Sequence, residues 1–250
     1  MSHNFNQGVR FGPFHSRQDW GLILESDDIG FPVATGIADD YGAYGLPEFD
    51  PKVTWSNRVL TFNFGIAGIE DRWPALVTTI TNALQGKKLQ IIRDCEPNVC
   101  YIGRCHVEAF RKELRIGHFV ITVNAEPYKQ VVIPTTYIPT GTRYTINYDG
   151  AYPAPCVVRV APTGAIATFT IGGLAHNPLT FAPEDIVIKG LKNDVPVIID
   201  GIKKTITENG ANKYAEATIW NFPMLVPGQN VLTFSHTTQV TRIQVYKRDI

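Results

Sequence analysis

The chain has 250 residues, of which 44% are hydrophobic and 18% charged, a composition that excludes an intrinsically disordered protein. Its 23 basic and 23 acidic residues cancel, which excludes the basic footprint of a nucleic-acid-binding or membrane-surface protein. No stretch approaches the roughly 20 apolar residues of a membrane span. The opening residues lack a basic region followed by an apolar run, so we expect neither membrane insertion nor a signal peptide.

Strand patterns dominate the first quarter of the chain. Three segments have them: residues 9–15, 20–25 and 55–64. In the third segment, alternation places Leu60, Phe62 and Phe64 on one face. Residues 27–50 are rich in Gly, Pro and Asp and predict a long loop. A loop of this length is usually functional or an interaction arm.

One helix is predicted at about residues 71–85. Apolar residues recur there at helical spacing: Trp73, Leu76, Val77, Ile80 and Leu84. Pro74 is tolerated in a first turn, and Gly86 suits the end of a helix. The β-branched run at residues 77–81 would also fit a strand. The length and the terminal signals favour the helix.

Strand patterns then resume up to a proline-rich segment. Two strands flank a turn at residues 96–98 and predict a hairpin at about residues 88–104. Five prolines lie between residues 126 and 155, which predicts a domain boundary near residue 140. We therefore expect a domain at 1–140, an α+β unit built as a β-sandwich with one helix, and a second domain at 141–250.

The second half has turn signals at the spacing of a β-sandwich. The pairs at residues 200–201 and 209–210 predict hairpins. The Pro-Gly pair at 227–228 predicts a type II turn between two strands of a further hairpin, with Leu232 and Phe234 on one face afterwards. No helix pattern alternates with the strands, which excludes a parallel sheet. The fold class is therefore mainly β, with a jelly-roll or galectin-like sandwich at the C-terminal end.

A metal site is the first chemistry to test. Cys95, Cys100, Cys105 and His106 form a C-x4-C-x4-C-H pattern. Cys100 and Cys105 lie at odd separation along a predicted strand and so face opposite sides, which does not suit tetrahedral zinc. We expect reduced cysteines acting as small buried hydrophobes, with no metal and no cofactor. A Cys95–Cys100 disulfide across the turn is an alternative that a reducing compartment disfavours.

Catalytic patterns are absent from the sequence. It contains no G-x-S-x-G elbow, no cysteine with a histidine signature and no phosphate-binding glycine loop. Paired carboxylates could serve glycoside hydrolysis, but Asp39, Asp40, Glu48 and Asp50 all lie in the Gly-rich loop, where solvated turn residues are the simpler interpretation. We therefore expect no catalytic residues and no enzyme, and keep a hydrolase as a third hypothesis.

Carbohydrate binding is the second hypothesis. A β-sandwich with exposed aromatic rings can stack sugars, and Tyr214, Trp220 and Tyr246 are available for this in the C-terminal half. Packing of these rings in or between the sheets is the simpler alternative. Loss of saccharide affinity on changing Trp220 or Tyr246 to Ala would separate the two.

The order of four segments resembles the distal tail protein family of tailed bacteriophages, over essentially the whole chain. The segments are "DWGLILESDDI", then "VTWSNRVLTFNFGIAG" followed by "EDRWPALVTTITNALQGKKLQIIRD", then "HFVITVNAEPYK", and finally "NFPMLVPGQNVLTFS". The chain departs from the family in its first long loop, where "IADDYGAYGLPEF" replaces a Pro-Gly-Arg-Asp-Gly-like turn. It also has no room for an inserted carbohydrate module, so it resembles the short form.

The resemblance implies a non-enzymatic structural hub at the tail tip of a virion, made in the host cytoplasm. Six N-terminal domains would form a ring between the tail tube protein and the tail-tip or baseplate protein. The C-terminal galectin-like domains would project outward and hold receptor-binding proteins. The channel would pass the tape-measure protein and then DNA, without sequence-specific nucleic-acid binding. In the long loop, we expect ring or neighbour contacts from Asp39, Asp40, Tyr41, Tyr44 and Phe49.

Overall fold

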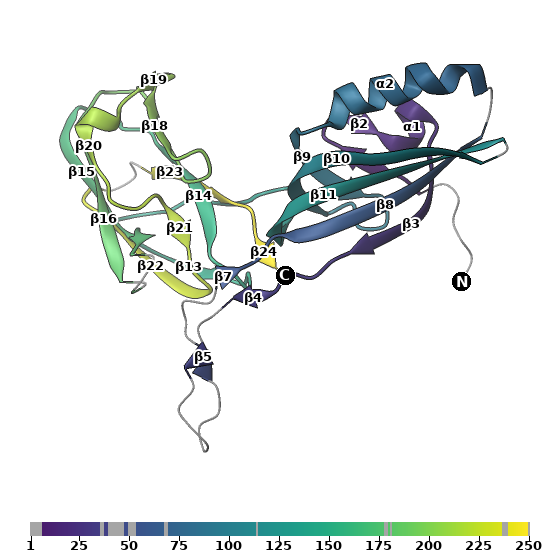
Figure 1. The fold of residues 1–250 in the computed structure, drawn as a ribbon. Coiled ribbons are helices and arrows are strands. Elements are labelled where there is room, and N and C mark those ends of the chain that lie inside the picture. The colour runs from purple at the N-terminus through teal and green to yellow at the C-terminus, as the bar shows by residue number, and fades with distance from the viewer. Residues whose placement is uncertain are drawn as a thin grey trace. The chain divides into compact units, whose positions relative to one another are not determined.

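The computed structural model describes residues 7–35, 38–39, 48–49, 54–67, 70–113, 115–177, 180, 182–236 and 240–249. The fold is mainly β, as the sequence predicts (Figure 1). The chain divides into two compact units, residues 1–132 with residue 250, and residues 133–249. The division falls ahead of residue 140, at the start of the proline-rich segment.

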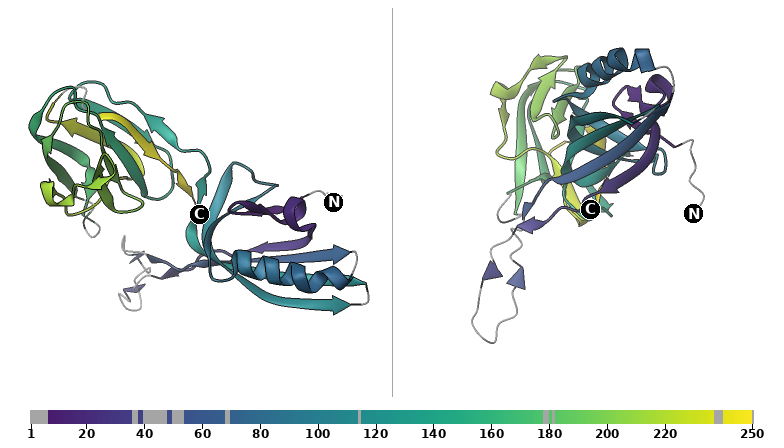
Figure 2. Two further views of the ribbon diagram at one scale, coloured as in Figure 1. Left: turned by 90° about the horizontal axis from the view of Figure 1, so that it is seen from above. Right: turned by 45° about the vertical axis from the view of Figure 1, so that its right-hand side comes forward.

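The N-terminal unit contains the following elements, in chain order: β1 (Val9–Phe11), β2 (Phe14–His15), α1 (Ser16–Trp20), β3 (Ile23–Ile29), β4 (Ala34–Thr35), β5 (Ala38–Asp39), β6 (Glu48–Phe49), β7 (Thr54–Trp55), β8 (Arg58–Ala67), η1 (Glu70–Arg72), α2 (Trp73–Leu84), β9 (Lys88–Arg93), β10 (Val99–Glu113) and β11 (Ile116–Val131). The main sheet has the order β2-β1-β9-β10-β11-β8-β3. Helix α2 lies along one face of this sheet (Figures 1 and 2).

Where the sequence predicts a β-sandwich for the N-terminal half, the structure has one continuous sheet that curls over its own core. Phe11 of β1 packs edge to face on Phe62 of β8, with ring centroids 5.7 Å apart, although three strands separate β1 from β8 in the sheet. The β10–β11 ladder has irregularities between Tyr101 and Gly103 and again after Val107. Bulges of this kind bend strands and raise their twist, which lets a single sheet enclose a core.

The predicted helix is confirmed as α2. Trp73, Ile80 and Leu84 are buried on its core side, and Trp73 packs edge to face on Phe110 at 5.9 Å. In the run that would also have fitted a strand, Thr78 and Thr79 are exposed and donate their hydroxyl protons to backbone carbonyls one turn earlier. Gly86 follows the helix with a φ of 71°, a left-handed conformation that suits glycine.

The strand predicted at residues 20–25 is partly wrong, because Trp20 ends a second, short helix. His15 caps α1, since its Nδ1 accepts from the backbone N–H groups of Arg17 and Gln18 at 3.2 and 3.3 Å. Gly21, with a φ of 67°, ends the helix. β3 therefore begins only at Ile23.

The alternation predicted for β8 is confirmed. Leu60, Phe62 and Phe64 are fully buried, and β8 pairs with β11 along its length. Leu60, Phe62 and Phe64 lie opposite Val123, Ile121 and Phe119 on the core face. The hairpin predicted at residues 88–104 is confirmed as β9 and the first part of β10, which continues to Glu113.

The C-terminal unit contains β12 (Thr135–Tyr137), β13 (Arg143–Tyr148), β14 (Ala154–Val160), β15 (Ile166–His176), β16 (Pro183–Leu191), β17 (Val197–Asp200), β18 (Thr205–Glu208), β19 (Ala211–Asn212), η2 (Tyr214–Glu216), β20 (Ala217–Thr218), β21 (Met224–Leu225), β22 (Gly228–Phe234), β23 (Val240–Val245) and β24 (Arg248–Asp249). One sheet has the order β12-β23-β14-β17-β18-β19, and the other β13-β22-β15-β16-β20. Both sheets contribute to one buried apolar core.

The turn at residues 227–228 does not close a hairpin. Gly228 has the positive φ, 90°, that a type II turn needs, and Leu232 and Phe234 face the core as predicted. However, β21 pairs with β14, whereas β22 pairs with β13 and β15 in the other sheet. Buried Asn230 holds this crossing, because its side chain accepts from the N–H of Val226 and donates to its carbonyl. The hairpins predicted at 200–201 and 209–210 are confirmed.

Lys213, between β19 and η2, carries a buried charge. The Lys213 side chain is 3% exposed and donates to Glu216 at 2.5 Å and to the Gly190 carbonyl at 3.1 Å. Its Nζ also lies 3.0 Å from Glu208. Burial raises the pKa of Glu208, but hydrogen bonds from Lys213 and Lys192 outweigh it and the pKa is lowered on balance.

Candidate assembly surfaces

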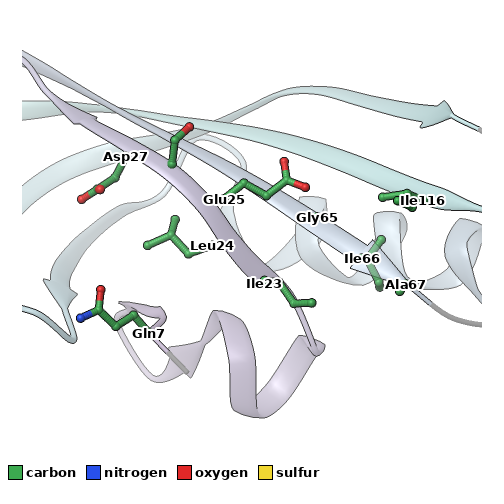
Figure 3. Close-up of a pocket in the computed structure, with 10 residues that line it drawn as sticks. Gln7, Ile23, Leu24, Glu25, Asp27, Gly65, Ile66, Ala67 and Ile116 are labelled. Atoms are coloured by element: carbon green, nitrogen blue, oxygen red, sulfur yellow. The ribbon is translucent and has the colours of Figure 1, made fainter. Parts of the chain in front are cut away.

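An open groove runs along β3 in the N-terminal unit. β3 is the last strand in the order of the main sheet, so among the described residues its outer edge has no strand partner. The groove has a volume of about 600 Å³ (Figure 3). Its apolar lining consists of Ile23, Leu24, Ile66, Ala67 and Ile116. An open edge beside apolar side chains can accept another chain.

A bulge shapes the middle of this edge. The β3–β8 register shifts between Leu24 and Ser26, which leaves Glu25 as an extra residue. The Glu25 carboxylate occupies the space that a Cβ on Gly65 would fill, so Gly65 makes room for it. Glu25 also lies 3.2 Å from Nδ1 of His118 on β11. The bulge therefore interrupts the regular ladder and places a charge over the groove.

An ion-pair cluster ties β3 to the opposite side of the curled sheet. Arg93 of β9 donates to Asp27 of β3 at 2.5 Å and also to Glu96. Burial lowers the pKa of Arg93, but the two carboxylates raise it more, so the guanidinium stays charged. The Arg93 side chain is only 16% exposed, so its ion pair with Asp27 is a partly buried link between two strands that lie far apart in the sheet. We call this link the Arg93 closure.

The long loop predicted at residues 27–50 is partly strand. β3 extends to Ile29, and short ladders join β4 to β7 and β5 to β6. Asp39 pairs with Glu48, and Phe49 pairs with Ala38. Of the predicted contact residues, Asp40, Tyr41 and Tyr44 lie outside the described residues. Residues 34–55, which we call the arm, thus contain two short strand pairs, β4 with β7 and β5 with β6.

The three aromatic residues predicted for sugar stacking lie in different environments. Trp220 is 84% exposed just after β20. Tyr214 is 46% exposed in η2 and packs near Phe222, with ring centroids 6.3 Å apart. Tyr246 is half-buried just after β23. Among the described residues, no ring contact joins any two of the three.

The cysteines are free thiols. Cys95 is exposed, whereas Cys100, Cys105 and Cys156 are buried. The Cys100 sulfur accepts from the side-chain amide of Gln90 at 3.0 Å, and burial raises the pKa of Cys105 to about 12. Within the described part of the chain, no three His, Cys, Asp or Glu residues gather in a way that could hold a metal ion. No described helix is long and apolar enough to cross a membrane.

Sequence patterns did not predict the groove along β3 or the Arg93 closure. The acidic run Glu25–Asp28 within a strand is the signal that could have indicated a protected edge. The sequence does not show that Arg93 binds this strand, because Arg93 lies 66 residues further along the chain than Asp27.

The sequence matches no protein-family model and no curated protein. Solved structures match along the whole chain, and one is the Dit protein of phage SPP1, described as a paradigm of the hub adsorption apparatus in phages that infect Gram-positive hosts. The TM-score is 0.72 at 12% identity, over 98% of this chain and 99% of that one. The chain has the fold of a phage distal tail hub protein.

The hub fold also occurs in two baseplate structures. A chain of the phage P2 baseplate in its activated conformation with Ca matches with a TM-score of 0.56 at 8% identity, over 98% of each chain. A chain of the phage p2 baseplate with Sr gives 0.54 at 8% identity, over 97% of each chain. The hub fold thus covers both units of this chain, which confirms the resemblance to the distal tail family at the level of the fold.

Proposed function

We propose that the chain is the structural hub of a bacteriophage tail tip. Six copies form a ring that joins the tail tube protein to the tail-tip or baseplate protein and to the receptor-binding apparatus. The hub acts by geometry and contacts rather than by catalysis. Its place is the virion, and the ring encloses a channel for the tape-measure protein and DNA.

One observation carries this proposal: the match to the SPP1 hub protein spans 98% of this chain and 99% of that chain. A shared accessory domain would leave one of the two units unmatched. The near-zero net charge is compatible with the proposal, because it gives little repulsion between copies.

The groove along β3 is the contact surface that we assign to the ring. Its open strand edge and its apolar side chains lie on the N-terminal unit, which the resemblance gives to the ring. Ile116 is 47% exposed at the groove, beside the half-buried side chains of Ile23 and Leu24. A neighbouring copy seated there would remove this apolar area from water.

The arm supplies the second surface. Its described parts are two short strand pairs, β4 with β7 and β5 with β6, and the sequence of the arm includes Asp39, Asp40, Tyr41, Tyr44 and Phe49. Two-stranded ribbons are marginally stable alone, so a neighbour that packs on the arm would stabilise it. We assign these residues to contacts with the next copy or with an adjoining tail protein.

The test is the solution mass, measured by light scattering on a sizing column over a concentration series. We expect a mass six times that of the 27.8 kDa chain, and a ring in negative-stain images. Since tail rings can assemble on their neighbours, the same measurement is repeated with the tail tube protein added. A monomeric mass under both conditions would contradict the hub proposal.

A matched pair of variants tests the groove. Ile116→Asp places a charge in the groove and should dissociate the ring, because an unpaired charge buried in an interface costs several kcal/mol. Ile202→Asp is the control, since Ile202 is 48% exposed in the C-terminal unit. If both variants keep the mass of the wild type, the groove is not the ring contact.

A further inference from the structure

Two arginines lie directly opposite each other on the outer face of one sheet of the C-terminal unit. Arg159 of β14 pairs with Arg242 of β23, and on its other side with Ile198 of β17. Like charges that oppose each other across a strand pair destabilise a sheet. Carboxylates placed over the two guanidinium groups would remove this repulsion and accept charge-assisted hydrogen bonds from them.

The row that contains the two arginines crosses five strands. Every step is a pairing between neighbouring strands, and the row runs in the order Arg242, Arg159, Ile198, Thr207 and Asn212. Alternation along the strands puts this row on the solvent side, because the residues that flank Arg159 and Ile198 are buried: Val158, Val160, Val197 and Ile199. From the spacing of strands, the row is about 19 Å long.

The face around this row is basic and partly apolar. Ile198 is 40% exposed between the arginines and the end of the row. A cavity of about 310 Å³ lies at that end, and its lining includes Thr207, Asn212 and Tyr214. Two residues along β17, Asp200 adds one carboxylate, whose Oδ1 accepts the N–H groups of two residues in the following turn. The face therefore offers positive charge beside apolar surface.

The arm carries the opposite arrangement of charge. Asp39 of β5 pairs with Glu48 of β6, so two acidic residues oppose each other across a strand pair. The sequence of the arm, residues 34–55, has four acidic residues and one basic residue, Lys52. Residues opposite each other in a strand pair have Cβ atoms about 5 Å apart. The acidic pair and the arginine pair thus match in spacing and have opposite sign.

The two units have net charges of opposite sign as well. Residues 1–132 contain 13 basic and 15 acidic residues, a net charge of −2. Residues 133–249 contain 10 basic and 8 acidic residues, a net charge of +2. The formal net charge of 0 for the whole chain therefore conceals two units that attract each other when they belong to neighbouring copies.

We propose that the arm of one copy docks on the arginine face of the next copy, with Asp39 and Glu48 over Arg159 and Arg242. The inference rests on the proposed function, because it needs an adjacent copy in the ring, and it names the surface that receives the arm. Docking relieves the repulsion within both like-charged pairs at once. The occupant is a second copy because this chain itself supplies both halves of the match.

The test compares charge-reversed variants of the full-length protein by light scattering over a dilution series. Arg159→Glu with Arg242→Glu reverses the face, and Asp39→Lys with Glu48→Lys reverses the arm. Each variant should raise the concentration at which the ring half-dissociates by about tenfold or more, because like charges then meet across the contact. Raising the salt concentration should weaken the wild-type ring in the same direction.

The matched control is Arg143→Glu with Lys189→Glu. It makes the same change in charge at two exposed residues of the other sheet of the C-terminal unit, on β13 and β16. This variant should assemble like the wild type. The proposal is overturned if the control loses as much assembly as the face variant, since net charge and not the arginine face would then be responsible.

Mixing the face variant with the arm variant identifies the neighbour. In the mixture, each arm meets a face of opposite charge when the two proteins alternate around the ring, so assembly should return towards that of the wild type. Its return also shows that both variants fold. If assembly returns only when both reversals are placed in one chain, the arm docks within its own chain and the proposal is overturned.

The remaining outcomes separate this inference from the hub proposal. A face variant that forms the ring at wild-type concentrations refutes this inference alone, including the case in which it has lost only the binding of another tail protein. A wild-type chain that stays monomeric, with and without the tail tube protein, refutes the hub proposal and this inference together.

Discussion

Replacing Arg93 with Met should loosen the edge of the N-terminal sheet. The substitution keeps much of the side-chain length and removes the guanidinium that joins Asp27 of β3 to Glu96. Two carboxylates then face the vacated position without a counter-charge. Because, among the described residues, β3 pairs with a strand on one side only, the loss of this closure should act first on β3.

The magnitude follows from the burial of the cluster. The Arg93 side chain is 16% exposed and that of Asp27 is 28% exposed. Breaking a fully buried pair costs about 3–5 kcal/mol and an exposed pair contributes at most about 1 kcal/mol, so we expect about 2 kcal/mol for Arg93→Met. Asp27→Asn should cost about 1 kcal/mol, and the double variant should show a coupling of about 1 kcal/mol between the two sites.

Hydrogen–deuterium exchange, read on a peptide that covers β3, measures the local effect directly. Urea unfolding gives the global effect, with Arg10→Met as a control on an exposed arginine of β1 that should change stability by less than about 0.5 kcal/mol. The reasoning is refuted if β3 exchanges at the wild-type rate in Arg93→Met. It is equally refuted if the free energies of the single variants add to that of the double variant within about 0.3 kcal/mol.

Three further predictions concern stability and thiol reactivity. Phe62→Ala should lower the free energy of unfolding by about 3–5 kcal/mol in urea titrations, because Phe62 is fully buried, whereas Val59→Ala, at a side chain 54% exposed, should change it little. Because folding lowers the pKa of Glu208, its ionised carboxylate stabilises the folded state above the unfolded pKa of about 4.3. This stabilisation is lost as the pH falls through the lower pKa of the folded state. Thermal unfolding between about pH 3 and 6 should show the loss in the wild type and less of it in Lys213→Met. A thiol reagent should label Cys95 before the other three cysteines in the native protein, although partial burial raises the pKa of its thiol, and all four after unfolding. Native labelling of a second thiol at the rate of Cys95 would contradict the burial of the other three.

Sequence alone determined the elements whose signals are local. The spacing of Trp73, Ile80 and Leu84 and the glycine that follows fixed α2, because a helix depends on contacts three and four residues apart. Alternation fixed β8 and its core face. The Asn-Gly pair at residues 209–210 fixed a hairpin, since both residues adopt positive φ values, 48° and 81°.

Tertiary structure alone decided which strands become neighbours. The turn at residues 227–228 is correct as a local conformation, yet the strands on either side belong to different sheets. The curl that brings Phe11 to Phe62 depends on bulges in a ladder whose partners are distant in sequence.

The same limit applies to the groove along β3. Asp27 and Arg93 are 66 positions apart in the sequence and meet only because the sheet curls. Local residue patterns set backbone dihedral angles over a few residues, whereas strand pairing and edge exposure follow from the contacts that minimise the free energy of the whole unit.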